Sequence, residues 1–286
     1  MSSPNDSLTS PVPTAGSSGV TLPDPGGSDA HTHMDIIGLP VDGVLAAAKA
    51  AGIKRVVNVG CDLDSSHWSA NTADEYDAVW AAVAIHPNET FNVTAVAPGN
   101  SMRSVLDTIE TLARRARVVA IGETGLDYYR DHAPRDLQQA YFRGHIEIAR
   151  RTGKALMIHD REAHEDVLSI LGEYAPWPPN SVIFHCFSGD AAMAERCASA
   201  GYVMSFAGNV TFKNADSLRE AARAAPAELM LAETDAPYLT PVPHRGKPNS
   251  PAMTAYTIRY LAALKNLDIT DFCTTLQATG SRAFGW

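Results

Sequence analysis

The sequence has few cysteines, no long apolar run and fewer basic than acidic residues. Its four cysteines lie far apart and form no CxxC pair, which argues against a disulfide framework or a thiolate zinc site and favours reduced thiols in a cytoplasmic protein. The longest apolar run, Ala78–Ile85, is far shorter than the roughly 20 residues that a membrane helix needs. Lys and Arg number 23 against 32 Asp and Glu, so the surface as a whole cannot act as a polyanion clamp and any nucleic-acid contact must be local.

The first 27 residues lack the features of an export signal. They contain no Lys or Arg and no apolar core, and they are rich in Ser, Pro and Gly. We therefore expect residues 1–27 to be a disordered leader. No Pro- or Gly-rich linker interrupts the rest of the chain, so residues 28–286 are predicted to form one domain.

From Val41 onward, short apolar runs alternate with longer amphipathic ones, as in strands that feed crossover helices. Strands are predicted at 55–59, 79–85, 118–121, 155–158, 182–184, 202–205 and 229–231. Helices are predicted at 41–51, 62–76, 101–115, 135–152, 162–172, 191–200, 215–224, 252–264 and 270–283. An eighth strand is expected at 28–30 from its position alone, because these residues have poor strand propensity. The pattern predicts an α/β fold, a single and slightly irregular (β/α)8 TIM-like barrel, with an open doubly wound sheet as the alternative.

The polar residues that stand out follow the carboxyl ends of these predicted strands. In a parallel barrel those ends converge on one face, so residues remote in sequence become neighbours around a single cavity. The residues that share this position are His31, His33, His86, Glu123, His159, His185 and Asp235. Their shared position is the strongest indication of a functional site in the sequence.

The spacing of His31 and His33 points both imidazoles to the same side of an extended chain. With Asp29 before the pair and Asp35 after it, the segment predicts a divalent-metal site rather than an incidental pair. Neutral imidazoles suit such a site because they bind a cation tightly without neutralising its charge.

Four more of these residues are candidate ligands. Glu123 has two carboxylate oxygens and can bind two cations at once, although it could instead cap the following loop or pair with an arginine. His159 and His185 occupy equivalent places on successive strands, which favours ligands over core histidines. Asp235 is predicted both to bind a metal and to accept a proton from the attacking water. Glu233 competes for that role but lies nearer the strand body.

The remaining candidates surround these ligands. Asp127 is expected at most to hold a ligand in place. Cys186 is expected to point away from His185 into the helical layer, because side chains alternate along a strand, which disfavours a Cys/His nucleophilic pair. His86 is a candidate for holding substrate. Cations that could grip a phosphate on the same face are Arg130, Arg161, Arg245 and Lys247. Histidines expected to lie exposed in helices or in loops are His67, His132, His145, His164 and His244.

Six sequence blocks follow one another from Asp29 to Leu239. They are Asp-x-His-x-His at 29–33, His-Pro at 86–87, Gly-Glu-Thr-Gly-Leu-Asp at 122–127, His-x-Arg at 159–161, His-Cys-Phe-Ser-Gly at 185–189 and Glu-Thr-Asp-Ala-Pro-Tyr-Leu at 233–239. In this order they resemble the TatD-like metal-dependent deoxyribonucleases of the amidohydrolase-type barrel superfamily, and the segment 245–251 resembles that family's late substrate loop. Two departures are Ala84 in place of the usual glycine and Gly26, Gly27 and Ser28 in place of apolar residues.

The resemblance implies a barrel metallohydrolase with two divalent metal ions, Mg, Zn or Mn. One metal would be held by His31, His33, Glu123 and Asp235, and the second by Glu123, His159 and His185. Glu123 and Asp235 would be catalytic, the first bridging the metals and the second accepting the proton of the attacking water. Non-reacting phosphate oxygens would be held by His86, Arg161 and Arg245.

The expected function is metal-dependent cleavage of DNA phosphodiester bonds. Because the chain is acidic overall, a short single-stranded end is expected to enter the barrel mouth, with 3'-5' exonuclease-like action. The same ligands would also serve a hydrolase of carbon esters or amides, such as an aminoacyl-tRNA deacylase or a small-molecule amidohydrolase. A non-catalytic barrel protein is disfavoured by the complete ligand set. No membrane association and no obligate protein partner are expected.

Overall fold

The computed structural model describes residues 20–96, 99 and 101–286. Its parallel strands lie side by side in chain order in one eight-stranded sheet. The sheet curls until its first and last strands meet, where Asp235 N–H donates to the His31 carbonyl at 3.0 Å and Thr32 bridges to Ala236. This (β/α)8 barrel confirms the predicted fold. The strands are β1 Gly27–Thr32, β2 Ile53–Val59, β3 Val79–Val83, β4 Val118–Asp127, β5 Ala155–Arg161, β6 Val182–Phe184, β7 Val203–Phe206 and β8 Met230–Ala232.

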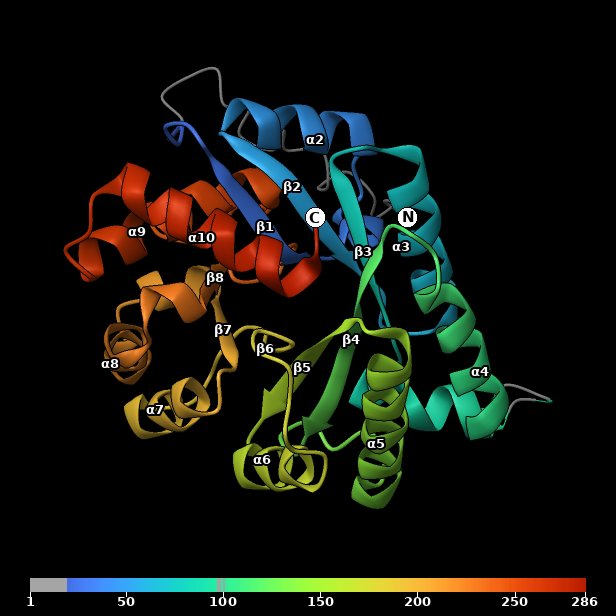
Figure 1. Ribbon diagram of the computed structural model, residues 1–286. Helices are drawn as coiled ribbons and strands as arrows, with labels where there is room; N and C mark the ends of the chain where they lie inside the picture. Colours follow the sequence, from blue (N-terminus) through green and yellow to red (C-terminus); the bar gives the residue numbers. More distant parts are fainter. Residues whose placement is uncertain (1–19, 97–98, 100) are drawn as a thin grey trace, which may run out of the picture.

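Helices surround the barrel on the outside (Figure 1). They are α1 Met34–Ile37, α2 Val41–Ala50, α3 Leu63–Glu75, α4 Met102–Ala113, α5 Arg135–Thr152, α6 His164–Glu173, α7 Ala191–Ser199, α8 Asp216–Ala224, α9 Thr254–Leu264 and α10 Ile269–Phe284. Short turns of 3-10 or π-helix are η1 Pro87–Glu89, η2 Asn92–Val96, η3 Gly208–Thr211, η4 Ala227–Leu229 and η5 Pro251–Met253. Three helices begin at a residue whose side chain accepts a hydrogen bond from the backbone N–H three residues later. These residues are Asp62 for α3, Ser101 for α4 and Asp190 for α7.

The apolar core has two parts, one inside the barrel and one between the barrel and the helices. Alternation along β2 shows both, since Val56 packs in the outer part whereas Val57 and Val59 pack in the inner part. The inner part also includes Phe284, from the end of α10, with Trp286 packed against it. The C-terminal residues therefore cover the amino-terminal end of the barrel, and the carboxyl ends of the strands remain available for a site.

Strand β1 forms despite its poor strand propensity because tertiary contacts hold it. The buried Asp29 carboxylate accepts hydrogen bonds from Thr234 N–H at 2.9 Å and from Thr234 Oγ1 at 2.6 Å, which ties β1 to the segment after β8. Burial raises the pKa of Asp29 to about 8, against the hydrogen bonds from Thr234. Gly27 is closely packed, since an added Cβ would lie 2.5 Å from the end of the Ile258 side chain and would require that side chain to move.

The predicted disorder does not extend to residue 27. Leu22 is buried and its N–H donates to the Ala51 carbonyl at 3.0 Å, while Arg259 donates to the Thr21 carbonyl at 2.6 Å. The Ser, Pro and Gly content predicts disorder, but contacts with Ala51, just after α2, and with Arg259 on α9 hold this segment. The rest of the predicted leader, residues 1–19, lies outside the described residues.

Strand β4 is longer than the sequence predicts. Its apolar run ends at Ile121, but pairing with β5 continues to Asp127, which lies opposite Arg161. Gly125 makes this possible, because its φ is +138° and an added Cβ would collide with the His159 carbonyl oxygen. The extension brings polar residues of β4 and β5 together at the carboxyl end of the barrel.

None of the helices in the described part combines the length and apolarity needed to span a bilayer.

Candidate metal centre and active site

A cavity of about 700 Å³ opens at the carboxyl ends of the strands. Six predicted ligands converge there from five of the eight strands or the residues just after them. His31 and His33 come from β1 and its end, Glu123 from β4, His159 from β5, His185 from the end of β6 and Asp235 from the end of β8. Five of the six line the cavity directly, and His31 lies beneath them, fully buried. The convergence predicted from strand ends is therefore present in the structure.

Each of the four histidines that are candidate ligands uses one ring nitrogen in a contact directed away from the centre of the cavity. His33 Nδ1 lies 3.1 Å from the Val59 carbonyl, and since a carbonyl only accepts, this nitrogen carries the proton. His31 Nδ1 lies 3.2 Å from the Met157 sulfur, also an acceptor. The Nε2 atom of each ring then carries a lone pair, and the two Nε2 atoms lie 3.1 Å apart. A cation between them would satisfy both, as neutral histidine ligands require.

His159 and His185 follow the same arrangement with carboxylates as their outer partners. His159 Nε2 lies 3.2 Å from Asp127 Oδ2, which leaves Nδ1 facing the centre. His185 Nδ1 lies 3.2 Å from Glu233 Oε1, which leaves Nε2 facing the centre. The two inward nitrogens are 3.5 Å apart. Carboxylate–imidazole pairs of this kind fix the tautomer and orientation of metal-binding histidines.

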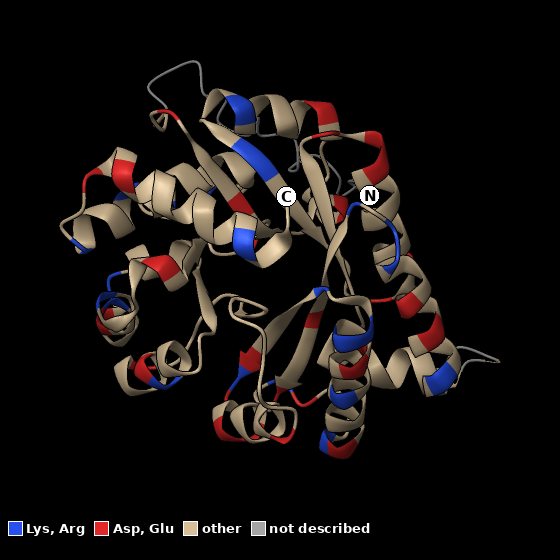
Figure 2. Cartoon of the chain, viewed as in Figure 1, with Lys and Arg blue, Asp and Glu red and all other residues tan. Residues whose placement is uncertain are grey.

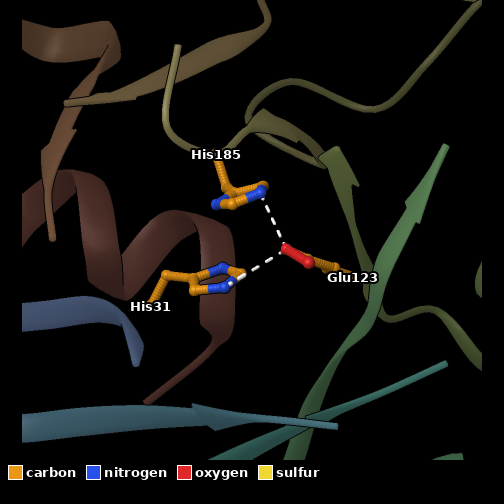
Figure 3. Close-up of side chains that lie close together, drawn as sticks. All are labelled: His31, Glu123 and His185. Atoms are coloured by element: carbon orange, nitrogen blue, oxygen red, sulfur yellow. Dashed lines mark ion pairs between the residues drawn. The ribbon is translucent and has the colours of Figure 1, made fainter. Parts of the chain in front are cut away.

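Glu123 lies between the two histidine pairs, as Figure 3 shows with His31 and His185. Its Oε2 is 2.8 Å from His185 Nε2 and 3.3 Å from His31 Nε2, yet it is buried without a hydrogen bond. Burial opposes the charge of Glu123, but positive charge at the neighbouring histidines, His185 first, outweighs it and holds the pKa of the carboxyl well below its ordinary value. A divalent cation bound there would supply that positive charge while the imidazoles stay neutral.

Asp235 completes the group around the first histidine pair. Its Oδ1 lies 3.6 Å from His33 Nε2 and 3.8 Å from His31 Nε2. Its backbone is left-handed, with φ of +52°, which turns the side chain into the cavity just after β8. Glu233, the competing acid, instead accepts hydrogen bonds from His185 and from Cys186 N–H at 2.8 Å. The structure therefore gives the two acids different places, with Asp235 at the cavity and Glu233 behind a histidine.

His86 differs from the other four histidines because its nitrogen that faces Glu123 carries the proton. Its Nδ1 accepts a hydrogen bond from Asn88 N–H at 3.1 Å, so Nε2 carries the proton, 3.2 Å from Glu123 Oε1. Burial lowers the pKa of His86 to about 3, so the ring is neutral. The side chain lines the cavity, but its one donor is directed at Glu123. This arrangement suits holding Glu123 more directly than holding substrate.

Two of the predicted cations reach the cavity. Arg130 and Arg161 line it, and the Arg161 guanidinium lies 4.3 Å from the centre of the Tyr129 ring. Arg245 is not among the lining residues, since its guanidinium lies over the Phe212 ring at 3.6 Å. The geometry thus supports a phosphate contact for Arg161 and not for Arg245, whose place in a Pro-rich loop could not be inferred from the sequence.

The structure also corrects the prediction for Cys186, which lines the cavity beside His185. Strand β6 ends at Phe184, and Cys186 has φ of +41°, so the alternation of a strand no longer applies. Burial raises the pKa of the Cys186 thiol well above its usual range, which favours the protonated thiol.

Other residues at the cavity were not singled out from the sequence. Cys61 follows β2 and Asn209 follows β7, so the strand-end position that identified the ligands applies to them too. Asn88 lines the cavity and donates to Asp127 Oδ2 at 2.9 Å. His145 was expected to be exposed but is fully buried within α5, where it contacts the Ile85 backbone.

Comparisons with known proteins identify the family of this chain. The family model described as TatD related DNase matches residues 28–285. The chain is 43% identical over 266 residues to the uncharacterized metal-dependent hydrolase TatD of Mycobacterium tuberculosis, covering 90% of this chain and 97% of that protein. It is 36% identical over 264 residues to the uncharacterized metal-dependent hydrolase YcfH of Escherichia coli K12, covering 90% and 94%.

A solved structure shows the same architecture. The crystal structure of YjjV, a TatD homolog from Escherichia coli K12, superposes with a TM-score of 0.81 at 25% identity, covering 91% of this chain and 98% of that one. The family match spans the barrel and contains every ligand described above. The chain belongs to the TatD related DNase family, and it is a metal-dependent hydrolase of that family.

Proposed function

We propose that this hydrolase cleaves phosphodiester bonds of DNA, removing nucleotides from single-stranded ends in the 3'-5' direction. The observation that supports this best is the set of three imidazoles, of His31, His159 and His185, whose inward nitrogens lie 2.8–3.9 Å from the buried carboxylate of Glu123, with His33 beside His31 and Asp235. In this proposal one divalent cation is held by His31, His33, Glu123 and Asp235, and a second by Glu123, His159 and His185.

The bound cations would supply two effects, a lower pKa for water and charge compensation at the phosphate. Glu123 contributes two oxygens from one buried side chain, with Oε2 at 3.3 Å from His31 Nε2 and Oε1 at 3.9 Å from His159 Nδ1, so it can serve both groups of ligands. Asp235, whose side chain is 16% exposed to the cavity, accepts the proton that the attacking water loses. The new bond forms from the water oxygen to phosphorus while the bond to the leaving sugar oxygen breaks, and that oxygen takes a proton from solvent.

Arg161 and Arg130 are the side chains placed to hold the substrate's phosphates. Both are exposed cations at the rim of a cavity whose floor is carboxylate and imidazole. A guanidinium donates two parallel hydrogen bonds to phosphate oxygens, which adds orientation as well as charge. Outside the cavity the charges are mixed, as Figure 2 shows for the interspersed basic and acidic residues on α5. Binding would therefore depend on contacts at the mouth rather than on a broad basic surface.

The test uses end-labelled single-stranded and duplex oligonucleotides with protein stripped of metal and refilled with Mg²⁺, Mn²⁺, Zn²⁺ or Co²⁺ in turn. We expect stepwise shortening of the single strand from the 3' end with at least one cation and no cleavage by the stripped protein. Glu123→Ala should remove this activity while leaving the protein folded. Full activity of that variant would overturn the bridging role of Glu123.

The same samples are assayed in parallel with aminoacyl-tRNA and simple acyl esters, because activated water also attacks a carbonyl carbon. If every metal-loaded form hydrolyses an ester or amide and none shortens an oligonucleotide, the nuclease proposal is wrong. Cleavage inside the strand or from the 5' end would support a phosphodiesterase activity but contradict the proposed removal of nucleotides from the 3' end.

A further inference from the structure

Most of the exposed apolar side chains in the described part of the chain follow the carboxyl ends of strands, and two of them, Ile36 and Tyr238, line the cavity. In the described part of the chain, the well-exposed large apolar residues are Ile36, Leu39, Phe91, Tyr129, Tyr238, Val242 and Leu267. All except Leu267 lie in segments that follow the carboxyl ends of β1, β3, β4 or β8. Scattered exposure needs no explanation, but apolar groups collected around one opening are typical of a binding surface.

Two tyrosines of this group are anchored to the acids of the site. Tyr129 is 59% exposed, and its backbone N–H donates to Asp127 Oδ1 at 3.0 Å. Tyr238 is 56% exposed, lines the cavity, and its backbone N–H donates to the Asp235 carbonyl at 2.8 Å. The backbone of each tyrosine is therefore tied to a residue of the candidate metal centre or beside it, and more than half of each residue is exposed.

The ring of Tyr129 is paired with a cation that faces the same cavity. The Arg161 guanidinium lies 4.3 Å from the ring centre, a cation–π contact that places a phosphate-binding group beside an aromatic face. Single-stranded nucleic acid needs this combination, because each nucleotide presents a phosphate and a flat base. A duplex hides its base faces, and a small ester has none.

The negative net charge of the protein favours a binding surface for single strands that does not depend on positive charge. At a formal net charge of -9, the protein gains little from the counterion release that drives most nonspecific DNA binding. Stacking on aromatic rings is independent of base sequence and supplies affinity without net positive charge. We propose that Tyr129 and Tyr238 form a base-stacking rim that holds the terminal nucleotides of a single strand while its phosphate enters the cavity. This inference rests on the proposed nuclease function.

The variants are Tyr129→Ala and Tyr238→Ala, singly and together, with Tyr→Phe at each position and Leu267→Ala as the matched control. Phe keeps the stacking face and removes the hydroxyl, whereas Leu267 is an exposed apolar residue between α9 and α10, outside the strand-to-helix loops. Turnover and Michaelis constant are measured for a short oligothymidylate and for an abasic strand of the same length, with tetrahydrofuran in place of each nucleoside, which is a phosphodiester without bases. Binding of fluorescein-labelled oligothymidylate to metal-stripped protein is followed by anisotropy.

We expect each alanine substitution to weaken oligothymidylate binding and raise its Michaelis constant about 5- to 100-fold more than that of the abasic strand. The Phe variants should restore binding, and Leu267→Ala should behave as the unaltered protein. If the protein shortens oligonucleotides but the alanine variants bind and cleave them as the unaltered protein does, the proposed base-stacking rim is wrong and the proposed nuclease function is supported. If the unaltered protein cleaves the abasic strand or an acyl ester and no base-bearing oligonucleotide, the nuclease proposal fails and the rim fails with it.

Discussion

At the scale of single residues, the candidate ligands depend on side chains that do not face the cavity centre. Glu233 is fully buried, and its Oε1 receives His185 Nδ1 at 3.2 Å and Cys186 N–H at 2.8 Å. Because Glu233 occupies Nδ1, the other nitrogen of His185 is directed at Glu123. Asp127 has the same relation to His159, at 3.2 Å. The two carboxylates thus determine which nitrogen each histidine offers.

Replacing Glu233 with glutamine tests this dependence. Gln retains the size and one acceptor oxygen, so the fold should be preserved, but it removes the charge behind His185. We expect the metal affinity to fall about 10- to 100-fold, as for the loss of comparable outer partners. Isothermal calorimetry of the stripped protein with Zn²⁺ or Mn²⁺ gives this value directly. Glu220→Gln on exposed α8 is the control, and equal affinities in both variants would show that Glu233 has no such role.

The convergence of the candidate ligands was predictable from the sequence, whereas most of the contacts that support them were not. A histidine or acid just after an apolar run is visible in the sequence, since strand ends converge in every parallel barrel. The direction of Cys186 could not be inferred, because it depends on β6 ending two residues earlier and on a left-handed backbone. His145 was missed because a polar residue on an amphipathic helix is normally exposed, and only tertiary structure shows that it is buried.

At the scale of elements, α5 fixes the ends of two strands through His145. Ile85 N–H, just after β3, donates to His145 Nε2 at 3.2 Å, so Nδ1 carries the proton and donates to Thr124 Oγ1 on β4 at 2.9 Å. Ile85 precedes His86, and Thr124 follows Glu123, so this histidine links the backbones that carry both residues. Burial lowers the pKa of His145 to about 3, which keeps the ring neutral with this pattern of donor and acceptor.

This buried histidine should make stability depend on pH. An unfolded histidine binds a proton below about pH 6.5, whereas folded His145 does so only near pH 3. Between these values the unfolded chain binds more protons, so the contribution of His145 is complete above pH 6.5 and is lost as the pH falls toward 3. His145→Gln keeps an acceptor and a donor but does not titrate. Urea unfolding at pH 7 and pH 5 should show a smaller acid-induced loss in this variant, by up to about 1.4 kcal/mol per pH unit. Equal losses in both proteins would contradict the assignment.

Most elements were also predictable, and the exceptions have one cause. Apolar runs indicated seven of the strands, but not the extension of β4 to Asp127, which contains no further apolar run and depends on pairing with β5. Similarly, β1 is held by Asp29 and by packing around Gly27 rather than by strand propensity. In both places tertiary contacts outweigh local preference, and a single sequence does not display those contacts.

At the scale of the whole molecule, the site joins parts of the chain that are distant in sequence. The six candidate ligands run from His31 to Asp235 and come from β1, β4, β5, β6 and β8 or their ends. The barrel positions these groups before any ion is added, because the ligands' outer partners are hydrogen-bonded within the protein. The unfolded chain has no comparable arrangement, so ion binding should favour the folded state.

Metal removal should therefore lower the melting temperature without unfolding the barrel at room temperature. A ligand present at 100 times its dissociation constant stabilises the folded state by about 2.7 kcal/mol. For a chain of this size each kcal/mol corresponds to about 2–4 °C, so we expect a decrease of about 5–10 °C after chelation, reversed by adding the cation back. The far-UV circular dichroism should be retained, because neither the apolar core nor the Asp29–Thr234 hydrogen bonds that join β1 to the segment after β8 involve a candidate ligand. Glu123→Gln should show a much smaller metal-dependent shift, since it weakens both groups of ligands at once. An equal shift in this variant would place the stabilising ion elsewhere on the protein.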